Sequence, residues 1–405
     1  MYTILSKPIE DKKIVWFSKT NNYAVVNSDA FEIITKILKK EPKPSLLQWI
    51  RLNFDLSSIN EEEILSQFTI LVNDNLKEKD YQESNQKQAF YNPKFFLDKN
   101  YTINSVGFYI GYQSEYVFSK FHPLFAHLES SMNLNHKQRH SYKVLDINNS
   151  IKLLKVHDHS KIICQKKQLH YLIIEFNNRN YTLKNIEIIG EWDYSEVHLF
   201  QGKFSMQILN DIYSKNDNQW MGVFHASAVS DSKNTILFLG DSGNGKSTSL
   251  AILNASGFNC VADDFVPIDT NKNVYCYPAA ISVKEKSWAA LKNYCPELEN
   301  LSIHHIKGLD KKVKYIPTNN MDYSKQYKCK ALVFIKYNPN VEIEIKEVPK
   351  IKAFEKLVPD SWISPTQNNA ESFMSWFLEL PCYQINYSNN DKMIKEVSKL
   401  FDNEL

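Results

Sequence analysis

Hydrophobic positions in the first 80 residues predict two strands followed by three helices. The apolar runs KIVWF and YAVVN are typical of short strands, and the segment SKTNN between them is typical of a turn. Helical spacing then appears at four apolar positions, Phe31, Ile34, Ile37 and Leu38. A second helix is predicted over PSLLQWIRLNF. A third is predicted over SSINEEEILSQFTILVNDNL, where Ser58 and Glu61 have the spacing of a capping box. This order of elements predicts a small winged-helix-like domain over residues 1–80.

Short apolar and alternating runs predict a β-rich middle region over residues 89–220. The runs SVGFYIGY, IKLLKVH, LHYLIIEF, YTLKNIEIIG and SEVHLF predict strands, mostly antiparallel, with one helix at about residues 203–215. The polar segment KEKDYQESNQKQ, residues 77–88, has no periodic apolar pattern. It predicts a linker between the first two regions.

From residue 221 the pattern becomes that of an α/β domain, which we expect to cover residues 221–405. NTILFLG is a continuous apolar strand, KSTSLAILNASG predicts a helix that ends at a glycine, and FNCVADDF predicts the next strand. Strand, loop, helix and strand in this order form the parallel unit of an α/β fold. The predicted fold class is therefore mixed, α+β in the first two regions and α/β in the third.

Composition narrows the class of partner and compartment. The 405 residues include 48 Lys and Arg against 46 Asp and Glu, a formal charge of +2, and this balance gives no indication of nucleic-acid or membrane binding. The six cysteines are scattered without a C-x-x-C pair, which favours reduced thiols. The first residues lack the apolar core of a signal peptide, and no apolar run reaches the ~20 residues that span a bilayer. We expect a soluble, cytoplasmic protein.

The sequence concentrates its few glycines in one segment. It has only 10 glycines, yet GDSGNGKS, residues 240–247, matches G-x-x-x-x-G-K-[ST], the phosphate-binding P-loop pattern. Glycines let such a loop wrap closely around phosphate oxygens, and the helix that follows adds its dipole. The pattern predicts that the side chain of Lys246 reaches the β- and γ-phosphates and that the hydroxyl of Ser247 binds Mg²⁺. The residues expected to contact the nucleotide are Gly240, Asp241, Ser242, Gly243, Asn244, Gly245, Lys246, Ser247 and Thr248.

Two acidic residues follow the next apolar strand. Asp263 and Asp264 end FNCVA, the position of a Walker-B carboxylate beside a phosphate loop. One carboxylate could hold Mg²⁺ and the other could accept the proton of an incoming hydroxyl; the alternative is a polar turn after a strand. His225 lies 15 residues before Gly240, at the predicted end of the strand GVFHASAV in a hairpin. It could orient an acidic side chain, or it could be purely structural.

This arrangement resembles the C-terminal catalytic domain of bacterial HPr kinase/phosphorylase, which phosphorylates a serine of a small carrier protein. The resemblance covers residues 225–268: the histidine, the GDSGxGKS loop and the VADD pair, at matching distances. It implies one role for each of five residues: Lys246 as the phosphate lysine, Ser247 as the Mg²⁺ hydroxyl, Asp263 as the metal-side carboxylate, Asp264 as the proton acceptor and His225 as its partner. Mg²⁺ and a nucleotide would be the cofactor and co-substrate. Because no N-K-x-D guanine signature is present, we expect ATP.

The chain also departs from that family. The glutamate that ligates Mg²⁺ downstream in HPr kinase has one candidate here, Glu285 in ISVKEKSW. The signature of the reverse phosphorylase activity is absent, so we expect only kinase activity. Lys311, Lys312 and Lys314 could serve the phosphates or lie on a solvated strand edge.

The N-terminal region is similar to PqqD-type domains, which bind the leader peptides of ribosomally made natural products. The resemblance lies in the hairpin, the helix after N-x-x-A-F, the F-D-L loop and the long last helix. It implies that residues 1–80 bind a precursor peptide whose extended leader adds a strand to the sheet edge. The alternative is a DNA-binding winged helix, which the near-neutral charge of this region disfavours.

Three functions remain after the sequence analysis. The first is an ATP-dependent kinase of a Ser or Thr hydroxyl on a ribosomal precursor peptide, related in type to lasso-peptide kinases. The second is a kinase of a small molecule or carrier protein. The third is a non-catalytic, ATP-dependent peptide-binding protein. The sequence leaves the oligomeric state open, a homo-oligomer included.

Overall fold

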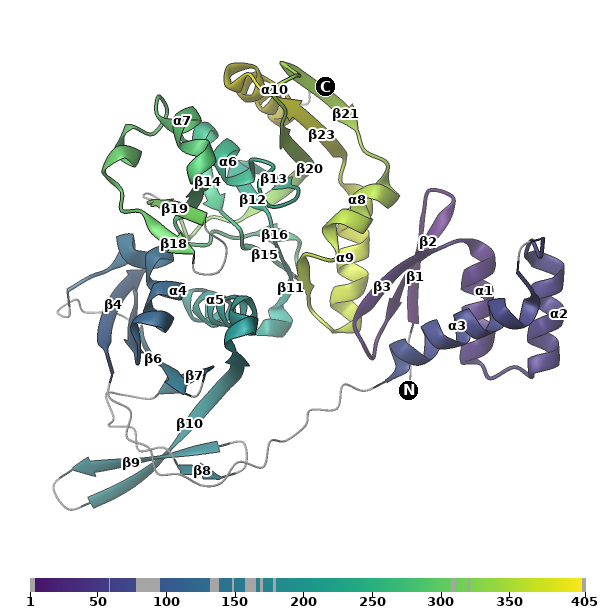
Figure 1. Cartoon of the computed structure of the whole chain (residues 1–405), viewed down its shortest axis with the longest axis horizontal. Helices are drawn as coiled ribbons and strands as arrows, with labels where there is room; N and C mark the ends of the chain where they lie inside the picture. The colour runs from purple at the N-terminus through teal and green to yellow at the C-terminus, as the bar shows by residue number, and fades with distance from the viewer. Residues whose placement is uncertain are drawn as a thin grey trace.

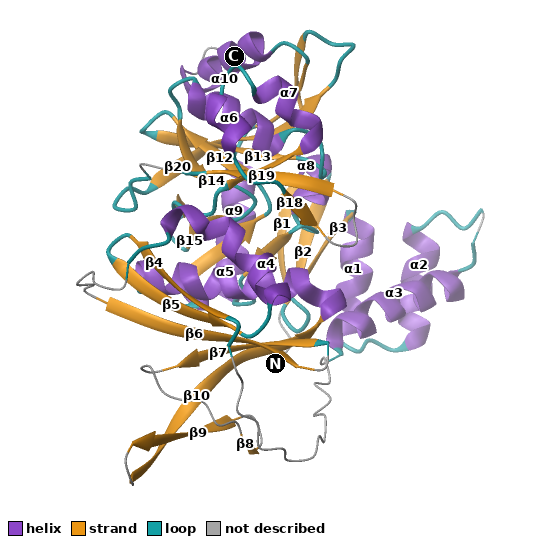
Figure 2. Cartoon of the chain, turned by 60° about the vertical axis from the view of Figure 1, so that its left-hand side comes forward, coloured by secondary structure: helices purple, strands orange, loops and turns teal. Residues whose placement is uncertain are grey.

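The computed structural model describes most of the chain as a mixed α/β fold with several sheets (Figures 1 and 2). The described residues are 4–57, 59–77, 95–131, 138–147, 149–156, 165–167, 170–177, 180–306, 311–318 and 321–402. The expected mixture of helix-rich, β-rich and α/β regions is confirmed at this level. Ser58 and nearly all of the predicted linker lie outside the described residues.

The N-terminal region contains one strand more than the hydrophobic pattern predicted. Its elements are β1 (Ile4–Ile9), β2 (Lys12–Phe17), β3 (Asn22–Val26), α1 (Ser28–Leu38), α2 (Lys43–Asn53) and α3 (Glu61–Leu76). The strands form an antiparallel sheet in the order β1-β2-β3. The side chain of Asn60 caps α3 by accepting a hydrogen bond from the backbone N–H of Glu63. Strand β1 was missed because its run ILSKPI contains a lysine and a proline, which are unusual within strands.

Strand β2 is apolar on both faces because both faces are covered. Val15 and Phe17 pack against the helices of the same region. Ile14 and Trp16, which alternate with them, belong to a large core shared with the C-terminal region. Figure 1 shows the sheet between its own helices and the segment containing α8 (Lys350–Leu357) and α9 (Gln367–Glu379). The N-terminal sheet is therefore docked on the C-terminal region.

The middle region forms a seven-stranded sheet in the order β4-β5-β6-β7-β10-β9-β8. Its strands are β4 (Leu97–Ile103), β5 (Val106–Tyr112), β6 (Gln138–Ile147), β7 (Ser150–Val156), β8 (Gln165–Lys167), β9 (His170–Asn177) and β10 (Asn180–Asp193). Helices α4 (Glu115–Phe125) and α5 (Val197–Tyr213) pack against this sheet (Figure 2).

Two expectations for the middle region are wrong. Strands β5 and β6 are parallel, because the unpredicted helix α4 carries the chain from the end of one to the start of the other. The internal Pro123 of α4 obscures its helical pattern. SEVHLF is not a strand but the start of α5, because Phe200 and Phe204 are buried at the helical spacing of four residues.

The C-terminal region is built on a ten-stranded sheet. Its main path runs β14-β12-β13-β20-β16-β15-β11-β22, with β23 pairing with β20 and β21. The strands are β11 (Trp220–Phe224), β12 (Ser227–Ser230), β13 (Asn234–Leu239), β14 (Asn259–Ala262), β15 (Val266–Asp269), β16 (Asn273–Val274), β20 (Tyr327–Tyr337), β21 (Ile343–Glu347), β22 (Ser361–Ile363) and β23 (Cys382–Tyr387). A smaller sheet contains β17 (Ile281–Lys284), β18 (His304–Ile306) and β19 (Lys311–Ile316). The remaining helices are α6 (Lys246–Ala255), α7 (Trp288–Leu291) and α10 (Asn390–Asp402).

Strands β13, β20 and β23 form a parallel block at the centre of this sheet. The predicted unit β13–α6–β14 is present, but β12 lies between the two strands and pairs antiparallel with each. The carboxyl ends of the parallel strands meet at one edge, where open α/β sheets bind their ligands.

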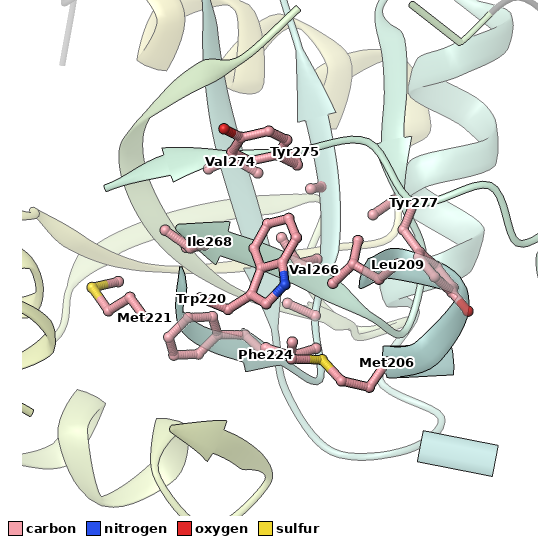
Figure 3. Packing of buried hydrophobic residues seen from close by; sticks show 14 of the residues in the cluster. Met206, Leu209, Trp220, Met221, Phe224, Val266, Ile268, Val274, Tyr275 and Tyr277 are labelled. Carbon is pink, nitrogen blue, oxygen red and sulfur yellow. The ribbon is translucent and has the colours of Figure 1, made fainter. Parts of the chain in front are cut away.

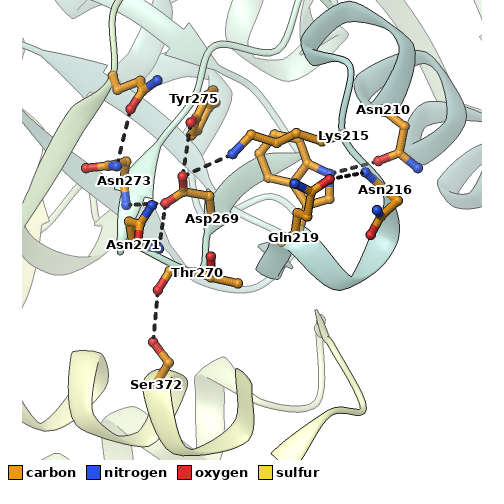
Figure 4. A network of polar contacts seen from close by, with 12 residues as sticks. Asn210, Lys215, Asn216, Gln219, Asp269, Thr270, Asn271, Asn273, Tyr275 and Ser372 are labelled. Atoms are coloured by element: carbon orange, nitrogen blue, oxygen red, sulfur yellow. Dashed lines mark hydrogen bonds and ion pairs between the residues drawn. The ribbon is translucent and has the colours of Figure 1, made fainter. Parts of the chain in front are cut away.

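A single apolar core joins the middle and C-terminal regions. Trp220 on β11 is fully buried, and its ring lies 5.9 Å from that of Tyr213 and 5.1 Å from that of Tyr275, both edge-on (Figure 3). Beside it, the buried carboxylate of Asp269 accepts hydrogen bonds from the backbone N–H groups of Asn271 and Asn273 and from the Tyr275 hydroxyl (Figure 4). Figure 4 also shows its ion pair with Lys215, at 3.1 Å. These contacts fix the start of the C-terminal sheet against the end of α5.

Two half-buried histidines predict that stability falls in mild acid. Burial lowers the pKa of His122, which contacts Tyr101, and of His127, which contacts Thr318, to about 4 each. The unfolded chain therefore binds more protons between pH 6.5 and 4, and stability is lost as the pH falls through this window. We expect a loss of about 1 kcal/mol per histidine between pH 7 and 5, after allowance for partial exposure. Urea unfolding at both pH values measures it. The double variant His122→Gln/His127→Gln should show a flatter dependence, and an unchanged one would contradict the assignment.

No helix in the described ranges has both the length and the apolar character needed to cross a bilayer.

Candidate functional site

The glycine loop, residues 240–247, joins the buried strand β13 to helix α6. Gly240, Gly243 and Gly245 all have positive φ angles, of 134°, 99° and 105°. A Cβ atom on Gly240 would lie only 3.2 Å from the amide nitrogen of Asn244 and from the carbonyl oxygen of Ile335. Glycine is therefore required here for conformation and for space, as the sequence pattern predicted.

The side chain of Lys246 curls back over this loop. The residue is 6% exposed, and its ammonium group donates a hydrogen bond to the carbonyl oxygen of Gly240 at 2.6 Å. A buried cation held over a loop with positive φ glycines is suited to an anionic ligand.

Asp263 lies against the start of α6, where the sequence placed it. It is 2% exposed and accepts hydrogen bonds from the hydroxyls of Ser227 (2.6 Å) and Ser247 (3.0 Å) and from the backbone N–H of Ser282 (3.0 Å). Burial, followed by the nearby charge of Asp264, raises the pKa of Asp263 to about 6. The two predicted metal ligands, Ser247 and Asp263, are thus in direct contact.

Asp264 differs from its neighbour in exposure and in backbone conformation. Its side chain is 58% exposed and lies 3.2 Å from the Nδ1 atom of His225. Its φ of 63° is unusual for a residue other than glycine, and such conformations cluster at functional sites. The adjacent acids therefore face different surroundings, one buried beside the glycine loop and one open to a reactant.

His225 does not end a strand of a hairpin, as expected. GVFHASAV forms two strands, β11 and β12, and His225 lies in the break between them. Strand β11 pairs with β15 and β22, whereas β12 pairs with β13 and β14, so the chain changes its place in the sheet at this point. The break leaves the histidine ring free to reach Asp264.

Lys284 is a site residue that the sequence analysis missed. Alternation along β17 buries Ile281 and Val283, and it places Ser282 and Lys284 on the other face. The Lys284 ammonium donates a hydrogen bond to the hydroxyl of Ser242 in the glycine loop at 2.6 Å. Burial and then the charge of Lys311 lower the pKa of Lys284. A second lysine therefore reaches the glycine loop, from a strand 36 residues further along the chain than its helix-borne neighbour is from the loop's start (284 − 248 = 36 beyond Thr248).

Replacing Lys284 is expected to slow any reaction of phosphate bound at this loop. We predict that Lys284→Ala lowers kcat by about 10- to 100-fold, the usual effect of removing one group that stabilises transition-state charge. Lys286→Ala is the matched control, because Lys286 is exposed and lies two residues further along. Steady-state kinetics with ATP measure both, and equal rates for the two variants would remove Lys284 from the site.

The other predicted basic and acidic candidates are not brought to the loop. Glu285 forms an ion pair with Lys312 at 3.0 Å, on the exposed side of β19. Lys314 is buried and donates hydrogen bonds to the carbonyl oxygens of Leu298 and Glu299, so it has a structural role. The printed contacts therefore do not support Glu285 as a ligand beside Ser247, nor Lys312 and Lys314 as phosphate contacts.

A cavity of about 540 Å³ opens beside the glycine loop at the carboxyl ends of β13, β20 and β23. His225, Gly240 and Asp241 line one side of it, and residues 355–361 line another. We call it the strand-end cavity. It is large enough for part of a substrate and has His225 in its wall.

In the described part of the chain, no three His, Cys, Asp or Glu residues gather as a metal-binding group. A divalent cation at the loop would therefore depend on Ser247, Asp263, phosphate oxygens and water, which is how Mg²⁺ is commonly held with nucleotides. Set against models of known protein families and against curated protein sequences, the chain matches none.

Proposed function

We propose that this protein is an ATP-dependent kinase that phosphorylates a Ser or Thr hydroxyl of a ribosomally synthesised precursor peptide. One observation carries the proposal. The exposed carboxylate of Asp264 lies beside His225, while the adjacent Asp263 contacts Ser247 of the glycine loop. A proton acceptor and a phosphate cradle are therefore next to each other.

The glycine loop supports ATP as the phosphate donor. Its backbone N–H groups and the N-terminus of α6 suit a triphosphate, and Lys246 and Lys284 supply positive charge. The hydroxyl of Ser247 and the carboxylate of Asp263 are the residues that would hold Mg²⁺. When bound, Mg²⁺ would neutralise charge on the phosphate oxygens.

The reaction would need little covalent chemistry from the protein. The acceptor oxygen forms a bond to the γ-phosphorus, and the bond from that phosphorus to the bridging oxygen of ADP breaks. The acceptor proton passes to Asp264, which His225 holds in place. Lys246, Lys284 and the loop amides stabilise the negative charge that spreads over the transferring group.

The open sheet in the N-terminal region supports a peptide as the acceptor. Strand β3 is the outermost strand of its sheet, and within the described residues no further strand pairs with its free edge. Such an edge can bind an extended peptide through main-chain hydrogen bonds. Because the sheet is docked on the C-terminal region, a peptide bound there would be held near the glycine loop.

Transfer of labelled phosphate tests the proposal. The protein is incubated with γ-labelled ATP and Mg²⁺, in separate reactions with Ser- and Thr-containing peptides of about 20 residues, with free serine, and with small alcohols. We expect label on peptides at rates well above those for the small acceptors. Equal rates for small acceptors would favour a small-molecule kinase. ATP binding without label on any acceptor would favour a non-catalytic peptide-binding protein.

A further inference from the structure

A second cavity adjoins the strand-end cavity and shares a wall with it. This β3–β22 groove, of about 490 Å³, lies between residues 21–24 and residues 358–363, with the end of α3 beside it. Pro359 and Ser361 line both the groove and the strand-end cavity. The same short segment of the C-terminal region therefore borders the N-terminal sheet and the candidate site.

Strand register orients the groove toward the proposed proton acceptor. Strand β22 pairs antiparallel with β11, so that Ser361 lies opposite Phe224 and Ile363 lies opposite Gly222. The residue after Phe224 is His225, whose ring lies 3.2 Å from Asp264. A chain that follows β22 from Ile363 to Ser361 therefore moves toward the side chains of His225 and Asp264.

Both strands that flank the groove have an open edge. β3 and β22 end their sheets, and no strand among the described residues pairs with the outer edge of either. The side chain of Asn21 closes one end by donating a hydrogen bond to the carbonyl oxygen of Ile363 at 2.6 Å. The hydroxyl of Tyr23, in the groove lining, is buried without a hydrogen-bond partner among the described residues. The groove thus offers unused hydrogen-bonding groups to an extended chain.

The two cavities differ in charge. The lining of the groove contains asparagines and apolar residues but no charged side chain. The strand-end cavity contains several charged groups, among them Asp241, Lys336 and Glu355. An uncharged peptide segment suits the groove, whereas a triphosphate would find no cation there to offset its charge.

We infer that an extended, uncharged segment of the acceptor peptide occupies the β3–β22 groove, and that Pro359 and Ser361 direct the residues beyond it to Asp264. The inference rests on the proposed function for the nature of the reaction, and it adds a path and a spacing. An extended chain rises about 3.3 Å per residue, so the length of β22 corresponds to roughly three peptide residues. The phosphorylated residue then follows the groove-bound segment within about ten residues.

Site-directed tethering tests the path independently of catalysis. An uncharged peptide of about eight residues, roughly 26 Å when extended, carries a benzophenone at its free end and is attached by a disulfide to Asn22→Cys in the groove. The matched control attaches the same peptide to Leu52→Cys on α2, where the side chain is 77% exposed and outside the groove. After illumination, mass spectrometry locates the cross-links.

From position 22 we expect cross-links on residues 358–361 and near His225, and from position 52 we expect neither. Identical patterns from the two positions, or no cross-link to 358–361 from position 22, would overturn the inference.

The same pair of tethers separates this inference from the proposed function. A serine replaces the benzophenone, and phosphate transfer from ATP is followed for a series of linker lengths. The path predicts transfer at least about tenfold faster from position 22 than from position 52, with one best length. Equal transfer from both would reject the path and keep the kinase. Cross-links at 358–361 with no transfer at any length would keep the path and reject the kinase.

Discussion

Asp264→Asn is expected to abolish phosphate transfer and to leave ATP binding nearly unchanged. Asparagine has the size of aspartate but cannot accept the proton of the attacking hydroxyl, so we expect kcat to fall by at least about 10³-fold. The side chain is largely exposed and does not contact the glycine loop, so the Kd for Mg²⁺–ATP should change by less than about threefold. Single-turnover transfer and isothermal titration measure the two quantities.

Ser230→Ala supplies no test of this point, whereas His225→Asn does, because His225 is the contact of Asp264. His225→Asn should keep part of the activity, since it removes only the group that orients the acceptor. Retention of wild-type turnover by Asp264→Asn would show that another group takes the proton.

Lys246→Met is expected to weaken ATP binding itself. Methionine keeps the apolar stem that fills this buried position but removes the ammonium group that lies over the glycine loop. Loss of a buried charge-assisted contact to phosphate costs about 2–3 kcal/mol, which raises Kd by roughly 30- to 150-fold. Titration with Mg²⁺–ATP measures the change.

The variant Lys286→Met is the control for this measurement, because Lys286 is exposed. Its Kd should equal that of the wild-type protein. If Lys246→Met also binds ATP with unchanged affinity, the glycine loop is not the phosphate site.

Local motifs in the sequence predicted most of the candidate site. The glycine loop and Asp263 could be placed because a strand, a tight loop and a helix follow one another without interruption, so their geometry depends on neighbouring residues. The contact of Ser247 with Asp263 follows from the same unit, although β12 lies between its two strands. His225 was identified as a candidate, but its position at a strand break depends on pairing partners distant in sequence.

Residues supplied by distant strands could not be predicted in this way. Lys284 reaches the glycine loop only because β17 pairs with β19 and projects alternate side chains toward the loop. The neighbouring Glu285, which the sequence analysis selected, lies after the end of that strand and turns to Lys312. A shift of one position along a strand reverses the face to which a side chain belongs.

The fold was predicted best where one face of an element is apolar. The helices of the N-terminal region have this pattern, and all three were located. Strand β2 is apolar on both faces, and its second covered face could not be assigned from sequence, since the partner is α9 and its surroundings more than 300 residues away. The β3–β22 groove exists because of this docking, so it too depends on long-range packing.

A structure of the protein with Mg²⁺ and a non-hydrolysable ATP analogue tests the central claim most directly. The account predicts the triphosphate over the backbone of residues 240–247, with Lys246 on its phosphates and the Asp264 carboxylate facing the γ-phosphorus across a space that admits a hydroxyl. A nucleotide bound elsewhere, or an Asp264 turned away from the γ-phosphorus, would contradict it.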